Sequence, residues 1–219
     1  IFQNKDDYNK FMSLVKINLK KIEFVQGSGV DTSYFLPRKF KENNRNIILP
    51  ARMLYEKGVY EFVEAARILK KRKIDVNFFL AGDTVSLNPS CISQEKISSW
   101  VEEGIVEYLG YQDNMRNLYW KMSIICLPSW REGFPKVLME AASCGIPVIT
   151  TDVPGCRDAI IDKKTGFLVP LKNPKILAEK IQTLIKDEKL QRTMGNAGRL
   201  LALNKFDLKT IVPQIVNLY

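Results

Sequence analysis

The sequence predicts an α/β protein built on a Rossmann-like, doubly wound parallel sheet with a helical carboxyl-terminal tail. Short, continuously apolar runs alternate along the chain with segments whose apolar residues recur at helical spacing. Unbroken apolar strands are typical of a parallel sheet that helices cover on both faces. Glycines and polar residues follow directly after several of these runs, where the ligand loops of such a sheet lie.

Each apolar run predicts a strand, and each apolar stripe at helical spacing predicts a helix. Turn residues separate these segments, for example Asn88-Pro89, Gly145 and Pro154-Gly155. The expected strands, in chain order, are 46–50, 76–81, 105–109, 124–127, 147–150 and 167–169. The expected helices are 59–71, a stretch around 97–101, 115–122, 135–144, 174–185, 190–203 and 208–219. The first helix shows the reasoning, because its apolar residues fall on one stripe: Val59, Phe62, Val63, Ala66 and Leu69.

The chain before this alternation has a different character. Residues 31–46 are polar and contain Pro37, so we expect a linker over 26–45. The chain begins with Ile1 rather than Met and has no signal-peptide pattern, which indicates a fragment or a processed chain. No apolar run reaches the length of a membrane span.

Composition limits the chemistry. The 219 residues contain no histidine, which excludes a Ser-His-Asp triad, a histidine general base and a histidine metal site within this chain. The four cysteines include no CxxC pair, so we expect reduced, buried thiols. The net charge of +9 favours anionic partners, such as phosphates or an acidic lipid surface. The chain has no zinc-finger spacing and no RNA-binding signature, so nucleic acid is not expected as a partner.

Five loops follow the expected strands and should meet at one edge of the sheet, since ligands bind there. They are Pro50–Arg52, Gly82-Asp83, Gly110-Tyr111, Ser129–Pro135 and Thr151–Gly155.

The fourth of these loops leads into a helix and holds two glutamates eight residues apart, Glu132 and Glu140. Pro135 suits a first helical turn, and several N–H groups between Gly133 and Val137 then lack a helical partner and can face an anion. Two alternatives stay open: Glu132 caps the helix, or Glu140 forms an i,i+4 pair with Lys136.

A set of motifs in a fixed order gives the chain a family resemblance. Over residues 20–205 it resembles GT-B glycosyltransferases of family 4. The motifs are Gly27-Ser-Gly-Val-Asp31, Ala51-Arg-Met-Leu-Tyr-Glu-Lys-Gly58, Ala81-Gly-Asp83, Tyr108-Leu-Gly110, Pro128-Ser129, Glu132 with Glu140, Cys144-Gly-Ile-Pro147, Val153-Pro-Gly-Cys156 and Thr165-Gly166. The resemblance implies a retaining, metal-independent transfer of sugar from a nucleotide-sugar donor, with no cofactor.

The resemblance also implies a division of the chain into one half of a GT-B fold and its flanks. Residues 1–25 would be the end of an amino-terminal acceptor domain that is otherwise missing. Residues 46–205 would be the Rossmann-like, nucleotide-sugar-binding domain, and 206–219 a carboxyl-terminal helix. Such a fragment is expected to bind donor weakly and to transfer little or no sugar by itself.

The family's roles carry over to matching positions. Arg52 and Lys57 would hold the donor diphosphate, where fixed cations stabilise the charge of the leaving group. Glu132 and the backbone from Gly133 through Phe134 and Pro135 to Val137 would meet the sugar and the distal phosphate. Lys136, where the family often has glycine or a hydrophobic residue, could add to phosphate binding or be an exposed lysine.

The nucleoside end follows from the same resemblance. Glu140 would accept both ribose hydroxyls. The base would lie near Tyr108, Leu109, Gly110 and Tyr111, with Tyr111 either stacking on it or serving as a rim residue. Gly82 and Asp83 would line the cleft, although an aspartate here could instead stabilise the turn. No residue is expected to act as a catalytic base.

Three functions compete at this stage. The first is the donor-binding half of a glycosyltransferase of surface polysaccharide biosynthesis, with a UDP-sugar favoured over a GDP-sugar and a saccharide or lipid-linked saccharide as acceptor. The others are a nucleotide-sugar 2-epimerase of the same architecture and a noncatalytic nucleotide-binding module. The expected location is cytoplasmic, with peripheral attachment to an anionic inner membrane face as the role of the surplus charge.

Overall fold

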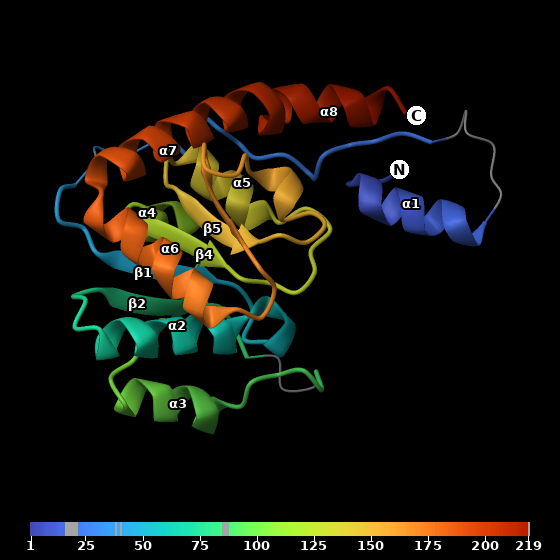
Figure 1. Ribbon diagram of the computed structural model, residues 1–219. Coiled ribbons are helices and arrows are strands. Elements are labelled where there is room, and N and C mark those ends of the chain that lie inside the picture. The colour runs from blue at the N-terminus through green and yellow to red at the C-terminus, as the bar shows by residue number, and fades with distance from the viewer. Residues whose placement is uncertain (16–21, 38, 40, 85–87, 219) are drawn as a thin grey trace.

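The chain forms one parallel sheet with helices on both faces, as a computed structural model shows (Figure 1). The structure describes residues 1–15, 22–37, 39, 41–84 and 88–218. The strands are β1 (Asn46–Pro50), β2 (Asn77–Ala81), β3 (Glu107–Tyr108), β4 (Ile124–Leu127), β5 (Val148–Thr151) and β6 (Gly166–Val169). Their order is β3-β2-β1-β4-β5-β6, and every neighbouring pair is parallel. The predicted doubly wound α/β fold is confirmed.

Helices cover both faces of this sheet, whereas the first helix of the chain lies to one side of it (Figure 1). The helices are α1 (Lys5–Leu14), α2 (Val59–Lys71), α3 (Gln94–Glu102), α4 (Met115–Tyr119), α5 (Lys136–Ser143), α6 (Pro174–Lys186), α7 (Glu188–Leu201) and α8 (Leu208–Val216). Short helical turns are η2 (Tyr55–Lys57), η3 (Arg157–Ala159) and the π-helical η4 (Ala202–Phe206). None of the helices in the described part of the chain is both long and apolar enough to cross a bilayer.

Two hydrophobic cores explain the unbroken apolar strands. Alternate side chains of a strand point to opposite faces, so Ile47 and Leu49 join the core under α2, α3 and α6, while Ile48 joins the core under α4 and α5. All three side chains are fully buried. A strand with apolar residues on both faces is the pattern that the sequence showed.

Element boundaries differ from the sequence prediction at several ends. The strand expected over 105–109 is only Glu107–Tyr108, because the N–H of Ile105 bonds to the carbonyl of Trp100 and closes the end of α3. The strand expected over 76–81 begins at Asn77, and that expected over 147–150 is shifted to Val148–Thr151. The helix expected over 135–144 begins at Lys136, with Pro135 as its extended N-cap residue.

The tail also differs in detail. The helix expected over 190–203 begins earlier, at Glu188, and gives way after Leu201 to the π-helical turn of η4. The helix expected to reach Tyr219 ends at Val216, and Tyr219 lies outside the described residues.

The segment before the sheet packs onto it at several points. Phe2 pairs with Phe24 in a parallel bridge, and Val30 pairs with Asp207. Val30 and Phe35 are buried in the core under α4 and α5 although they fall in the stretch expected to be a linker. The division of the chain into an acceptor-domain remnant, a linker and a donor domain stays a prediction.

Gly58 is where the loop after β1 meets the loop after β4. Its φ is 72°, and a Cβ at this position would lie 2.1 Å from the carbonyl oxygen of Pro128. The conformation favours glycine, and the close approach excludes any side chain. Gly58 therefore sets how closely these two loops approach each other.

We predict that Gly58→Ala destabilises the protein far more than Gly110→Ala, as measured by urea unfolding. Both glycines have positive φ, but a Cβ on Gly110 would meet nothing within 4 Å. Gly110→Ala should cost about 1–3 kcal/mol for the backbone conformation alone. Gly58→Ala should add roughly 1–3 kcal/mol for the forced contact. Equal losses in the two variants would contradict the close approach at Pro128.

Candidate functional site

Two adjoining cavities lie at the carboxyl ends of the strands, beside the point between β1 and β4 where the strand order reverses. Open α/β sheets bind ligands at such a point. The larger cavity has a volume of about 690 Å³ and the smaller about 220 Å³. Both are lined by the same five residues, Pro50, Ala51, Arg52, Lys136 and Val137. Arg52 and the first turn of α5 thus stand where the two cavities join.

The five loops expected at one edge do come together there. Gly82 and Asp83 line the larger cavity with Tyr111, and Glu132 and Pro135 line the smaller. The N–H of Gly82 bonds to the carbonyl of Gly110 at 2.8 Å. The loop after β5 lies against the loop after β4, because the Thr151 hydroxyl donates to the carbonyl of Ser129.

An ion pair forms the far end of the smaller cavity. The Lys57 ammonium lies 2.7 Å from Oε1 of Glu132, and the side chains are 18% and 13% exposed. The Ser129 hydroxyl donates to the same oxygen at 2.7 Å. Among the described residues, Glu132 accepts from Lys57 and Ser129 and from no N–H of α5, so the alternative that it caps the helix is wrong. Lys57, expected as a diphosphate ligand, thus also fixes the position of Glu132.

Glu140 reaches the larger cavity from the second turn of α5. It is 7% exposed, and the Tyr119 hydroxyl donates to its Oε2 at 3.0 Å. Lys136 lies 3.8 Å from its Oε1 but is largely exposed, so the i,i+4 pair forms without closing the cavity. Burial raises the pKa of Glu140, and the Tyr119 hydrogen bond and Lys136 oppose that rise. Burial and the neighbouring carboxylate hold the pKa of Tyr119 well above its usual value, so it stays a donor.

The residues expected around a base divide into two groups. Tyr111 is 65% exposed at the cavity rim. Tyr108, Leu109 and Gly110 are not among the residues that line either cavity. The Tyr108 hydroxyl instead donates to the carbonyl of Gly82 at 2.9 Å, which braces the loop after β2.

Two residues of the loop before α5 also line neither cavity. Phe134 is buried and packs edge-on against Phe206, so it belongs to the core. Gly133 lines neither cavity, and its carbonyl oxygen accepts from the Asn4 side chain at 3.1 Å. These two residues hold the loop through contacts outside the two cavities.

Several residues of the site were not predicted from the sequence. The larger cavity is also lined by Tyr34, Phe35, Gln112, Asp113 and Met115. The aromatic pair at 34–35 stands out in the otherwise polar stretch expected to be a linker, and that contrast is the signal that could have found it. No spacing in the sequence connects Tyr119 with Glu140.

Trp130 was also missed, and it fixes the Glu132 loop to the elements that carry Lys57. Its indole N–H donates to Glu61 on α2 at 2.9 Å, and its backbone N–H donates to the carbonyl of Glu56 in η2 at 2.8 Å. The Lys172 ammonium covers the ring, 3.9 Å from its centroid. The loop that carries Glu132 is therefore bonded to η2, which carries Lys57, and to α2, which follows it.

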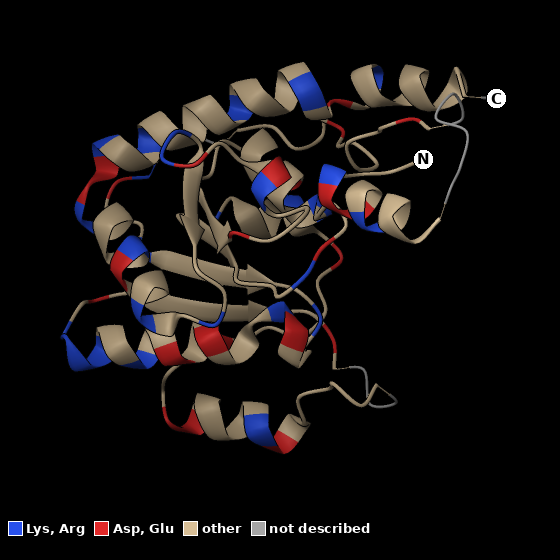
Figure 2. Cartoon of the chain, turned by 45° about the vertical axis from the view of Figure 1, so that its right-hand side comes forward, with Lys and Arg blue, Asp and Glu red and all other residues tan. Residues whose placement is uncertain are grey.

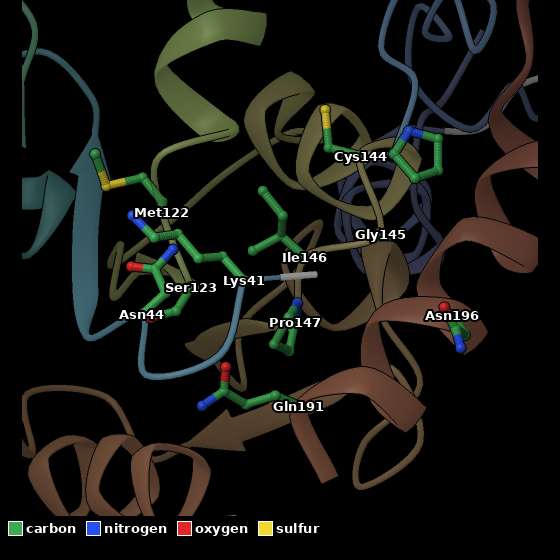
Figure 3. Close-up of a pocket in the computed structure, with 11 residues that line it drawn as sticks. Lys41, Asn44, Met122, Ser123, Cys144, Gly145, Ile146, Pro147, Gln191 and Asn196 are labelled. Carbon is green, nitrogen blue, oxygen red and sulfur yellow. The ribbon is translucent and has the colours of Figure 1, made fainter. Parts of the chain in front are cut away.

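A further small cavity of about 70 Å³ lies between α7 and the segments that precede β1, β4 and β5 (Figure 3). Cys144 lines it, and burial raises the pKa of this thiol to about 12. A thiol that stays protonated is a poor nucleophile. This cavity therefore offers no chemistry comparable to that at the other edge of the sheet.

Residues 33–201 match the family model of glycosyl transferases group 1. The match covers most of the chain, and the chain therefore belongs to this family. The resemblance to glycosyltransferases read from the sequence motifs is confirmed at the family level.

Two curated relatives illustrate the family. One is the N,N'-diacetylbacillosaminyl-diphospho-undecaprenol alpha-1,3-N-acetylgalactosaminyltransferase of Campylobacter jejuni, which is 34% identical over 100% of this chain and 59% of its own length. Another is the capsular polysaccharide biosynthesis glycosyltransferase CapM of Staphylococcus aureus, 30% identical over 83% of this chain and 47% of its own length. The chain thus spans about half the length of these relatives.

Solved structures share the fold. HepE of Anabaena in complex with UDP superposes with a TM-score of 0.85 at 20% identity, covering 99% of this chain and 62% of HepE. The carboxyl-terminal domain of the glycosyl transferase group 1 protein LpcC from Francisella tularensis superposes with a TM-score of 0.72 at 25% identity, covering 82% of this chain and 99% of that domain. The chain therefore has the architecture of the carboxyl-terminal half of a GT-B glycosyltransferase.

We predict that Glu140→Gln stabilises the protein increasingly as pH rises, as measured by thermal unfolding between pH 4 and pH 8. The raised pKa means that the folded state holds the proton more tightly than the unfolded state, so Glu140 favours folding at low pH. That contribution is lost as pH rises through the folded-state pKa. Glutamine keeps an acceptor for Tyr119 and never ionises. If the difference in stability between variant and wild type did not change with pH, the ionised Glu140 would not destabilise the folded state, and the prediction would fail.

Proposed function

We propose that this chain is the donor-binding half of a retaining, metal-independent glycosyltransferase that uses a UDP-sugar. The observation that carries the proposal is the pair of adjoining cavities with Arg52 at their junction, Glu140 in the larger and the Lys57–Glu132 pair in the smaller. A nucleoside needs the larger space and a hexose the smaller, and the diphosphate between them needs positive charge at the junction. The larger cavity, the Arg52 junction and the smaller cavity follow one another in this same order.

The nucleoside would lie with its ribose toward Glu140. An ionised carboxylate accepts hydrogen bonds only and has room for two hydroxyl donors. Tyr119 occupies Oε2 from the protein side, and Lys136 approaches Oε1 from the solvent side. The base would lie against the rim that Tyr111 forms with Tyr34.

The diphosphate would lie at the junction, between Arg52 and the first turn of α5. The first N–H groups of a helix have no partner within the helix and carry partial positive charge. Lys57 gives one of its three N–H donors to Glu132, and two remain for phosphate oxygens. As the bond to the sugar breaks, negative charge grows on the leaving diphosphate. Fixed cations and amides stabilise that charge without reorganisation.

Glu132 would hold the sugar by accepting from its hydroxyls. Its carboxylate is fixed by Lys57 and Ser129, and a carboxylate so constrained loses little entropy when a sugar binds. None of these residues is assigned as a base toward the acceptor. Metal independence and retention of configuration are parts of the proposal.

The relatives support the choice of donor and acceptor. The Campylobacter relative is named for transfer to a diphospho-undecaprenol-linked saccharide, and CapM for capsular polysaccharide biosynthesis. HepE was solved with UDP and, in other crystals, with UDP-glucose. We extend these to a UDP-sugar and a lipid-linked saccharide acceptor in surface polysaccharide biosynthesis. The net charge of +9 fits an enzyme that works in the cytoplasm beside an anionic membrane surface.

The proposal predicts that UDP stabilises the 219-residue chain against thermal unfolding more than GDP or ADP does. A ligand at ~100 times its dissociation constant adds about 2.7 kcal/mol to stability. Arg52→Ala should remove most of the UDP effect. Lys71→Ala, an equal charge change at the exposed end of α2, should leave it unchanged. The absence of a shift with all three nucleotides and their sugars would sink the proposal.

The two alternative functions need a product assay in the longer protein. An epimerase would convert the sugar nucleotide without any acceptor, whereas a transferase would need one. A noncatalytic module would bind donor and turn over nothing. Turnover that survives Glu132→Ala would count against the transferase.

A further inference from the structure

The amino-terminal segment, residues 1–14, approaches the sugar end of the site from outside the sheet. Phe2 bonds through its backbone to Glu23 and Val25, and its ring lies 5.5 Å from that of Tyr8 and 5.3 Å from that of Phe11. These contacts make a small aromatic unit around α1. The start of α1 lies against the loop before α5, and acidic and basic segments adjoin there (Figure 2).

The Asn4 side chain makes a buried contact between this segment and the Glu132 loop. Asn4 is 4% exposed. Its amide nitrogen donates to the Gly133 carbonyl at 3.1 Å and to Asp7 at 2.9 Å, while its oxygen accepts from the backbone N–H of Asp7 at 2.7 Å. The same side chain therefore caps α1 and holds a carbonyl 129 residues away in the sequence.

The carbonyl that Asn4 holds belongs to a loop with little freedom on its other side. A Cβ on Gly155 would lie 2.4 Å from the Gly133 oxygen and 2.5 Å from the Glu132 oxygen. The backbone of Glu132 and Gly133 is thus confined between the loop after β5 and Asn4. A shift at Gly133 would displace the neighbouring Glu132, whose carboxylate points to the smaller cavity.

Two ion pairs flank this contact. Arg131 lies 3.5 Å from Asp7, and Arg157 lies 3.4 Å from Asp6. The arginines are 72% and 40% exposed, so the pairs orient α1 rather than hold it firmly. The buried amide of Asn4 is the stronger connection of the three.

We propose that Asn4 is a positioning residue for the sugar of the donor: by holding the Gly133 carbonyl it sets the position of Glu132. The inference rests on the proposed function, since it assigns Glu132 to the sugar. Under this proposal the amino-terminal segment is part of the donor site. Loss of the Asn4 contact should weaken binding of the sugar but not of the nucleoside, because the nucleoside binds at Glu140, more than one helical turn away.

Asn4→Ser tests the proposal on the 219-residue chain. Serine caps a helix about as well as asparagine but has no amide to reach Gly133. The readout is the ratio of the dissociation constant of UDP to that of a UDP-sugar, measured by calorimetry with UDP-glucose and UDP-N-acetylgalactosamine. We expect UDP affinity within about twofold of wild type and a ratio lowered roughly five- to tenfold, the effect of one lost hydrogen bond.

Matched variants separate this outcome from a general loss of structure. Asn9→Ser, an exposed position on the same helix, should leave both affinities unchanged. Asn4→Asp keeps the cap, lacks the donor and sets a negative charge toward the Gly133 carbonyl, so its ratio should fall at least as far. An unchanged ratio in Asn4→Ser, or an equal loss for UDP and UDP-sugar, would overturn the proposal. Failure of wild type to bind UDP at all would instead remove the proposed function.

Discussion

The contact between the loop after β1 and the loop after β4 governs this site. Gly58 lies against the Pro128 carbonyl, and no other residue leaves that distance intact. The approach brings Lys57 to Glu132, and Trp130 then fastens the second loop to η2 and α2 through Glu56 and Glu61. The bond between Trp130 and Glu56 joins the two backbones directly, and the two side-chain bonds need the loops to lie close together. The ion pair is a consequence of the close approach more than its cause.

The site also contains buried carboxylates that the stability of the fold does not require. Glu140 is buried and its pKa is raised, and Glu61 leaves its Oε2 buried without a hydrogen bond among the described residues. Burying such groups costs free energy unless they are fully paired. In Glu140 the cost is located where a ligand with two hydroxyls would relieve it. In Glu61 the single bond to Trp130 instead holds the loop that carries Glu132 in place.

The sequence predicted the sheet well because its evidence is local. Apolar runs such as 46–50 and 124–127 are strands, since burial on both faces demands apolar residues at every position. The sequence predicted β3 poorly. The N–H of Ile105 bonds to the end of α3 and not to a neighbouring strand, and the pattern of apolar residues does not reveal such turn geometry. For the site, spacing identified Glu132 and Glu140 and family motifs identified Arg52 and Lys57. The partners Tyr119, Trp130 and Asn4 are distant in sequence, and only the fold brings them there.

The weakest attachment in the site is that of α1, which depends on one amide and two exposed ion pairs. Dissolved salt screens exposed charges over about 8 Å at physiological ionic strength and leaves buried contacts largely alone. The two ends of the proposed donor site should therefore respond differently to dissolved salt. The proposed nucleoside end rests on the buried Glu140. At the proposed sugar end, the two exposed ion pairs that orient α1 should weaken as ionic strength rises, while the buried Asn4 amide keeps its bond to Gly133. Rising ionic strength would thus change the orientation of α1 before it changes the contact between Asn4 and Gly133.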